Sequence, residues 1–160
     1  MPFALTLALA VMAAVITPGC SHAAARAQSR PTPPSTAALE QAVFQQVNAY
    51  RARQRLPALR WDERLAQQAR QHSQTMLHSG LGHAGFEQRL AAIGLRWSVA
   101  AENVASNHGG PDPATRAVQD WLNSPGHRRN LEGSYTLTGI GAARDARGEV
   151  AFTQIFLRPR

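Results

Sequence analysis

Three side chains of this sequence have the types needed for metal binding or proton transfer. His83 lies in the glycine-rich segment GLGHAGF, Glu102 is a lone carboxylate among apolar residues in VAAENVAS, and His127 follows the tripeptide SPG. Two imidazoles and one carboxylate could supply three ligands to a divalent ion such as zinc and leave an open position for water. The spacing alone gives this site no support, because no two of the residues form a ligand pair on one helix. In the alternative, His83 is a loop residue and His127 packs on a helix end.

His127 is predicted to lie in the first turn of a short helix. A residue before proline is pushed out of the α region, so Ser124 should end one helix and cap a new one that has Pro125 at its first position. The positive end of the helix dipole disfavours an imidazolium there. We therefore expect a neutral His127 ring, the form that ligates a metal or accepts a proton.

A nucleophilic mechanism is the other chemistry that these residues allow, with Ser124, His127 and Glu102 as a catalytic triad. Ser124 is better explained as a helix cap, and the sequence has no G-x-S-x-G elbow. The only cysteine is Cys20, so no disulfide is expected in the domain. His72 lies near the apolar stripe of a predicted helix, where we expect a hydrogen-bonded core or boundary histidine and not a ligand.

The elements that position these side chains follow from the apolar periodicity and the turn residues. The pattern predicts helices at 37–54, 63–79, 86–93 and 114–123, an extended segment at 99–106, and a terminal hairpin in which DARG joins TGIGAAR to EVAFTQIFL. Asp62 is a plausible N-cap and Gly80 a plausible C-terminal stop of the second helix. Helices that precede a terminal hairpin predict an α+β domain, with the helices packed on a small antiparallel sheet.

The N-terminal region predicts export. We expect a signal peptide at 1–25, a disordered Pro/Ser/Thr/Arg tether at 26–36 and the folded domain at 37–160. The apolar run 3–16 has 14 residues, which is short for a membrane span of about 20. Cys20, in TPGCS, resembles a lipobox cysteine, whose lipid would anchor the protein without spanning the membrane. The alternative is ordinary cleavage after Ala23, Ala25 or Ala27.

The charge pattern argues against nucleic-acid binding. The formal net charge is +7, and all 17 basic residues are arginine. They are scattered along the chain, and the densest run, RARQR at 51–55, falls near a predicted helix end, where cations complement the dipole. No aromatic residues are interleaved with them to stack on bases. We expect the arginines to form a solvated surface, with no nucleic acid as a partner.

The order of motifs resembles a bacterial member of the CAP/SCP family, which comprises cysteine-rich secretory proteins, antigen 5 and pathogenesis-related 1 proteins. The motifs are VNAYRARQRLPALRWDERLAQQARQHSQTM, GHAGFEQRL, AAENVA, WLNSPGHRRNL, TGIGAARD and FTQIF, and they cover about 40–157. The resemblance implies an α-β-α sandwich, a secreted or surface-exposed protein, and a central cleft of histidines and acidic residues that binds a divalent cation in several members.

Matched by motif, the resemblance places three residues in that cleft. His83 matches the histidine of the H-x-x-F segment, Glu102 the glutamate of the G-E-N motif, and His127 the histidine of S-P-G-H-R-x-N. Ser124 falls where eukaryotic relatives have a second cleft glutamate. We therefore expect an exported, monomeric binding module for an envelope ligand or a lipid, with zinc or magnesium as the candidate metal. The alternative is a metal- or histidine-dependent hydrolase that acts on peptide or cell-wall substrates.

Overall fold

The computed structural model describes residues 32–108 and 110–160. The predicted signal peptide, Cys20 and most of the predicted tether lie outside these residues. The described elements are, in chain order, α1 (Thr36–Arg53), β1 (Arg60–Trp61), α2 (Glu63–Ser79), α3 (Phe86–Ile93), β2 (Trp97–His108), α4 (Pro113–Asn123), α5 (Pro125–Glu132), β3 (Leu137–Arg144) and β4 (Glu149–Pro159).

The strands form one sheet in the order β1-β3-β4-β2. The predicted terminal hairpin, β3 with β4, is antiparallel and occupies the centre of the sheet, and β2 pairs antiparallel to β4 along its whole length. The expectation of a purely antiparallel sheet is wrong at one edge, where β1 pairs parallel to β3. Two residues are too few for their alternation to be recognised in a sequence, which is why β1 was not predicted.

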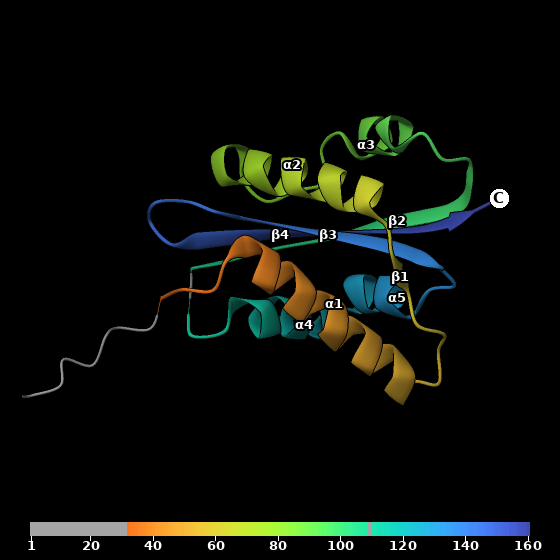
Figure 1. Cartoon of the computed structure of the whole chain (residues 1–160), viewed down its shortest axis with the longest axis horizontal. Coiled ribbons are helices and arrows are strands. Elements are labelled where there is room, and N and C mark those ends of the chain that lie inside the picture. The colour runs from red at the N-terminus through yellow and green to blue at the C-terminus, as the bar shows by residue number, and fades with distance from the viewer. Residues whose placement is uncertain (1–31, 109) are drawn as a thin grey trace, which may run out of the picture. The chain divides into compact units, whose positions relative to one another are not determined.

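Helices cover both faces of the sheet, which confirms the predicted α-β-α sandwich (Figure 1). α2 and α3 pack on one face, and α1, α4 and α5 on the other. Two glycines of β3 allow α2 to approach closely. A Cβ added to Gly139 would lie 2.1 Å from the Ala66 backbone nitrogen, and one added to Gly141 would lie 2.0 Å from the Arg70 backbone nitrogen. The sequence TGIGA therefore fits a strand with a helix directly on it.

The helix boundaries follow from caps that the sequence displays. Ser35, Asp62 and Asp112 each accept a hydrogen bond from a backbone N–H in the first turn of α1, α2 and α4, respectively. The predicted cap at Asp62 and stop at Gly80 are confirmed. β2 runs from 97 to 108, so the extended segment predicted at 99–106 is too short at both ends.

Three arginines are not on the solvated surface that was predicted for them. Arg51 and Arg89 are buried, and Arg70 is half-buried and pairs with the buried Glu40. Periodicity could have indicated Arg51, because it lies four residues after the buried Val47 on the same helix. The guanidinium groups of these long side chains find polar partners inside the domain. The net charge of the sequence therefore does not tell how many arginines face water. None of the helices described between residues 32 and 160 is long and apolar enough to cross a membrane.

Candidate functional site

β2 places Glu102 on the face of the sheet that α2 and α3 cover. Side chains alternate along the strand: Ala100 and Val104 pack with residues of this side, whereas Ala101 and Ala105 pack with the α1 and α4 side. Glu102 shares the parity of the first pair, and its side chain is 1% exposed. A carboxylate so far removed from water requires a cationic partner.

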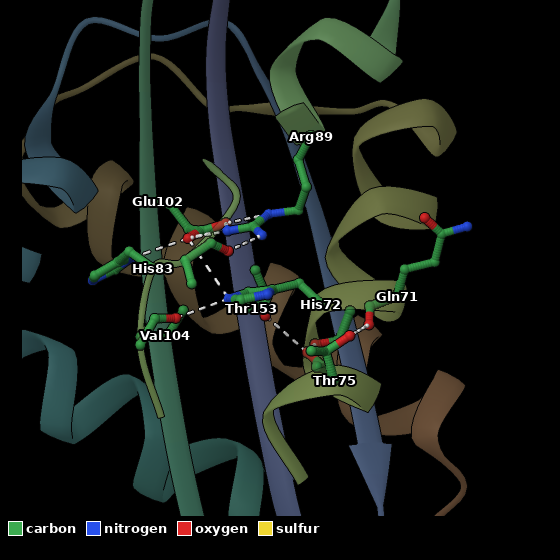
Figure 2. A network of polar contacts seen from close by, with 12 residues as sticks. Gln71, His72, Thr75, His83, Arg89, Glu102, Val104 and Thr153 are labelled. Atoms are coloured by element: carbon green, nitrogen blue, oxygen red, sulfur yellow. Dashed lines mark hydrogen bonds and ion pairs between the residues drawn. The ribbon is translucent and has the colours of Figure 1, made fainter. Parts of the chain in front are cut away.

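That partner is Arg89 of α3, as Figure 2 shows. Its Nε donates to Oε2 of Glu102 at 3.0 Å, and its Nη2 lies 2.8 Å from each carboxylate oxygen. Nη1 donates to the Ala84 carbonyl at 2.7 Å, so the same guanidinium also holds the segment beside His83. This role of Arg89 was not predicted. The available signal was the position of Arg89, three residues after Phe86 and four before Ile93, which puts it on the apolar face of α3.

His83 lies in the loop between α2 and α3, and Glu102 orients its ring. The His83 Nδ1 atom is 3.0 Å from Oε1 of Glu102 (Figure 2). A carboxylate held by a guanidinium is ionised and can only accept, so Nδ1 donates. In the neutral ring the proton then stays on Nδ1, which leaves a lone pair on Nε2. The His83 side chain is 51% exposed, so an external molecule can reach this ring.

His72 of α2 fixes the backbone of the same loop. Its Nε2 atom is 2.8 Å from the Gly82 carbonyl oxygen and 3.9 Å from Oε1 of Glu102. Because a carbonyl only accepts, Nε2 carries the proton. The prediction of a hydrogen-bonded core or boundary histidine is confirmed. Burial lowers the pKa of the His72 imidazole below its ordinary value, and the nearby Arg89 charge lowers it further, against the hydrogen bond to Gly82.

His127 lies next to His83 in space. α5 begins at Pro125, so His127 is in its first turn as predicted, and the centroids of the His127 and His83 rings are 6.3 Å apart. The His127 carbonyl accepts from Nδ2 of Asn103 at 3.1 Å, which ties the start of α5 to β2 beside Glu102. Burial, and secondarily the neighbouring His83, lower the pKa of the His127 imidazole, so this ring is neutral at pH 7.

Ser124 separates α4 from α5, but its side chain does not cap α5. It has extended dihedral angles (φ −96°, ψ 116°), as expected before proline, and makes no side-chain capping hydrogen bond. The predicted cap is therefore correct in position and wrong in its chemistry. In the described chain, no hydrogen bond joins Ser124 to His127, or His127 to Glu102, so this conformation does not assemble the alternative triad.

The three-ligand metal site does not fit this geometry. Both oxygens of Glu102 already accept from Arg89, whose positive charge would repel a dication at the same carboxylate. Within residues 32–108 and 110–160, no group of three or more His, Cys, Asp or Glu side chains is arranged to hold one metal ion. Glu102 instead orients the ring of His83, as a carboxylate commonly does for an imidazole that binds a metal or accepts a proton. The two rings are the donors that remain for zinc, whereas magnesium prefers oxygen ligands.

Known proteins share this arrangement of elements. Residues 44–156 match the model of the cysteine-rich secretory protein family, CAP. YkwD of Bacillus subtilis (strain 168) is 33% identical over 116 residues, which cover 68% of this chain and 44% of that protein. A crystal structure of an extracellular protein containing a SCP domain from Bacillus anthracis str. Ames has a TM-score of 0.63 at 32% identity, and the match covers 81% of this chain and 45% of that one.

One solved structure matches over almost its full length. An outer surface protein from Borrelia burgdorferi has a TM-score of 0.71 at 20% identity, covering 79% of this chain and 97% of that chain. At this identity the likeness concerns the fold alone. The chain thus spans less than half of the length of YkwD, and nearly all of this structural neighbour. With the family model matching most of the described domain, the chain belongs to the cysteine-rich secretory protein (CAP) family.

Proposed function

We propose that this protein is an exported binding module of the cell envelope or the extracellular space, which recognises its ligand through the rings of His83 and His127. Two observations support export. The leader has the features of a signal peptide, and the 32% identical solved protein from Bacillus anthracis str. Ames is described as extracellular. The observation that carries the binding role is the orientation of an exposed imidazole by a buried carboxylate, itself held by a buried arginine.

The geometry indicates what such a ligand must offer. In the neutral His83 ring the proton lies on Nδ1 beside Glu102, so Nε2 is the acceptor that a ligand can meet. His127 is neutral at pH 7 and adds a second ring, whose centroid lies 6.3 Å from that of His83. Leu81, in the same loop as His83, is 59% exposed and offers an apolar side chain. A ligand that combines a hydroxyl or amide donor with an apolar part fits this surface, and envelope polymers and lipids both contain such groups.

The proposal is tested by NMR of the histidine imidazoles in the full chain, with soluble peptidoglycan fragments as the probe. We expect the ring signals of His83 and His127 to shift and to saturate, while those of His78, exposed at the end of α2, stay unchanged. His83→Ala should abolish the shift at His127, and His78→Ala should not. Equal shifts at all three rings would overturn the proposal.

Hydrolysis is the second candidate, and the Glu102–His83 pair is the observation that favours it. An imidazole oriented in this way can act as a general base toward water through Nε2. The same samples are assayed for newly released reducing ends and amines. Turnover that His83→Ala removes and His78→Ala keeps would establish a hydrolase; saturable binding without turnover would establish the binding module.

Metal binding stays a prediction, now restricted to the two rings. Calorimetric titration of the full chain with zinc chloride decides it, compared with His83→Ala, His127→Ala and the control His78→Ala. If the rings bind zinc, the first two variants lose the heat of binding and the control keeps it. Equal zinc affinity in all four proteins would assign the metal elsewhere.

A further inference from the structure

A small cavity lies between two turns that the histidine site does not include. Its volume is about 260 Å³, and its wall is formed by the turn after α1 and the turn between α5 and β3. Leu56 and Pro57 contribute apolar surface, and the polar residues of the wall are Arg51, Glu132, Ser134, Tyr135, Thr136 and Arg158. None of the described histidines lines it. A cavity of this size is suited to a ligand smaller than a typical drug or cofactor, whose sites start near about 300 Å³.

Arg51 brings a buried positive charge to this wall without a carboxylate partner among the described residues. The residue is 1% exposed. Its Nε donates to the Pro57 carbonyl at 2.9 Å, and its Nη1 donates to the carbonyls of Leu131 at 2.7 Å and Gly133 at 2.9 Å. Burial lowers the pKa of the guanidinium, because carbonyl dipoles replace water without neutralising the charge. An anion in the cavity would supply the missing opposite charge.

Two donors on the wall have no partner within residues 32–108 and 110–160. Nη2 of Arg51 makes no hydrogen bond there, and neither does the hydroxyl of Tyr135, a residue that is 9% exposed. Neither atom is sealed in the protein, since the only fully enclosed side-chain N or O without a partner in the described chain is Oε1 of Gln154. Both donors belong to residues that line the cavity.

The wall is also built to keep Tyr135 in place. Its ring packs on Phe156, with centroids 5.3 Å apart, and against Gly133, where an added Cβ would lie 2.2 Å from the ring. Arg158 is tied by Nε to the Ser98 hydroxyl at 3.2 Å and by Nη1 to the Ser134 hydroxyl at 3.3 Å. The carboxylate on the wall, that of Glu132, accepts a hydrogen bond from the Tyr50 hydroxyl.

We propose that this cavity is a second ligand site, which binds the oxyanion of a small carboxylate or phosphate compound. Arg51 and Arg158 provide the positive charge, and Nη2 of Arg51 and the Tyr135 hydroxyl provide donors that are otherwise unused in the described chain. Guanidinium groups match the paired oxygens of carboxylates and phosphates. Leu56 and Pro57 contact a short apolar part of the same ligand. The two arginines outweigh Glu132, so the wall carries a net positive charge.

The test follows the arginine Nε–Hε signals of the full chain by NMR during titrations with sodium phosphate, acetate and butyrate at constant ionic strength. We expect saturable shifts at Arg51 and Arg158. Arg158→Gln should weaken affinity about tenfold, since a hydrogen bond to a charged group contributes on that order. Tyr135→Phe keeps the ring and should weaken it about fivefold through loss of the hydroxyl. Both variants spare Arg51, whose replacement could prevent folding.

Arg60→Gln is the matched control, because Arg60 is exposed on β1 and does not line the cavity. Its affinity should stay within about twofold of the unmodified chain. Tighter binding of phosphate than of the carboxylates assigns the ligand as a phosphate compound, and tighter binding of butyrate than of acetate assigns it as a carboxylate with an apolar part. Shifts that do not saturate, or an equal loss in Arg60→Gln and Arg158→Gln, would overturn the proposal.

Discussion

The carboxylate of Glu102 accepts hydrogen bonds from a buried guanidinium and from an exposed imidazole. Arg89 reaches both carboxylate oxygens, and His83 donates to one of them. Removing one member of a buried ion pair leaves the other uncompensated, and this costs more than the pair itself contributes. The carboxylate therefore stabilises α3 against β2 and orients the ring of His83 at the same time.

Glu102→Gln should lower the free energy of unfolding by about 3 kcal/mol or more, because Arg89 would remain buried without a counter-charge. Urea denaturation measures this. The double variant Arg89→Met with Glu102→Leu should be clearly more stable than Glu102→Gln, because both charges are then removed together. A loss below about 1 kcal/mol in Glu102→Gln would show that the pair is not buried in solution.

Stability should fall on mild acidification because His72 and His127 have lowered pKa values. The unfolded chain then binds more protons than the folded one below the ordinary histidine pKa of 6.5. The two neutral histidines make their full contribution to the free energy of unfolding above pH 6.5. This contribution is lost as the pH falls through their lower pKa values in the folded state. Denaturation midpoints between about pH 7 and pH 5 measure it, above the range where most carboxylates titrate. His72→Gln should reduce the dependence of the denaturation midpoint on pH. An unchanged dependence would show that His72 does not cause it.

The family resemblance, and not the spacing, predicted that His83, Glu102 and His127 lie near one another. In the structure His83 contacts Glu102, and its ring centroid lies 6.3 Å from that of His127. The roles of Arg89 and His72 could not be read with equal ease, since they depend on which helix face lies against β2. For Ser124 the position was predicted correctly and the role was not. It occupies the N-cap position of α5, but its side chain makes no capping hydrogen bond.

Among the elements, β3 packs directly against α2. Its two glycines lie against the backbone of α2, so the sheet and the helix touch without side chains between them. This contact sets the height of α2 above the sheet and therefore the position of His72. The hairpin periodicity and its turn predicted β3 and β4 well. The parallel pairing with β1 was not predictable, because it depends on the long return of the chain from α5.

Gly141→Ala should destabilise the domain by about 3 kcal/mol or more, since the new methyl group would have to displace the backbone of α2. Gly126→Ala in α5 is the matched control. Its Cβ would meet nothing closer than Nη2 of Arg129 at 4.0 Å, so the substitution should stabilise by about 0.5 kcal/mol through helix propensity. Thermal denaturation of both variants checks this. Similar melting temperatures for the two variants would contradict the close approach of α2.

For the whole molecule, the leader remains the part of the sequence that the structure does not test. If Cys20 is lipidated, the protein should be recovered with membranes, and Cys20→Ala should release it to the soluble fraction without changing the stability of the domain. Fractionation with mass determination of the mature N-terminus measures both. A mature chain that begins after Ala23, Ala25 or Ala27 would instead establish ordinary signal cleavage.

The strand order has a consequence for when this domain can fold. In the described sheet β2 pairs only with β4, and β1 only with β3, so no strand finds its partner until Leu137 and the residues that follow it have been made. Contacts between such distant segments form slowly, and a chain that still lacks β3 and β4 has no sheet on which to pack its helices. The sheet therefore cannot form until both of these strands have been synthesised.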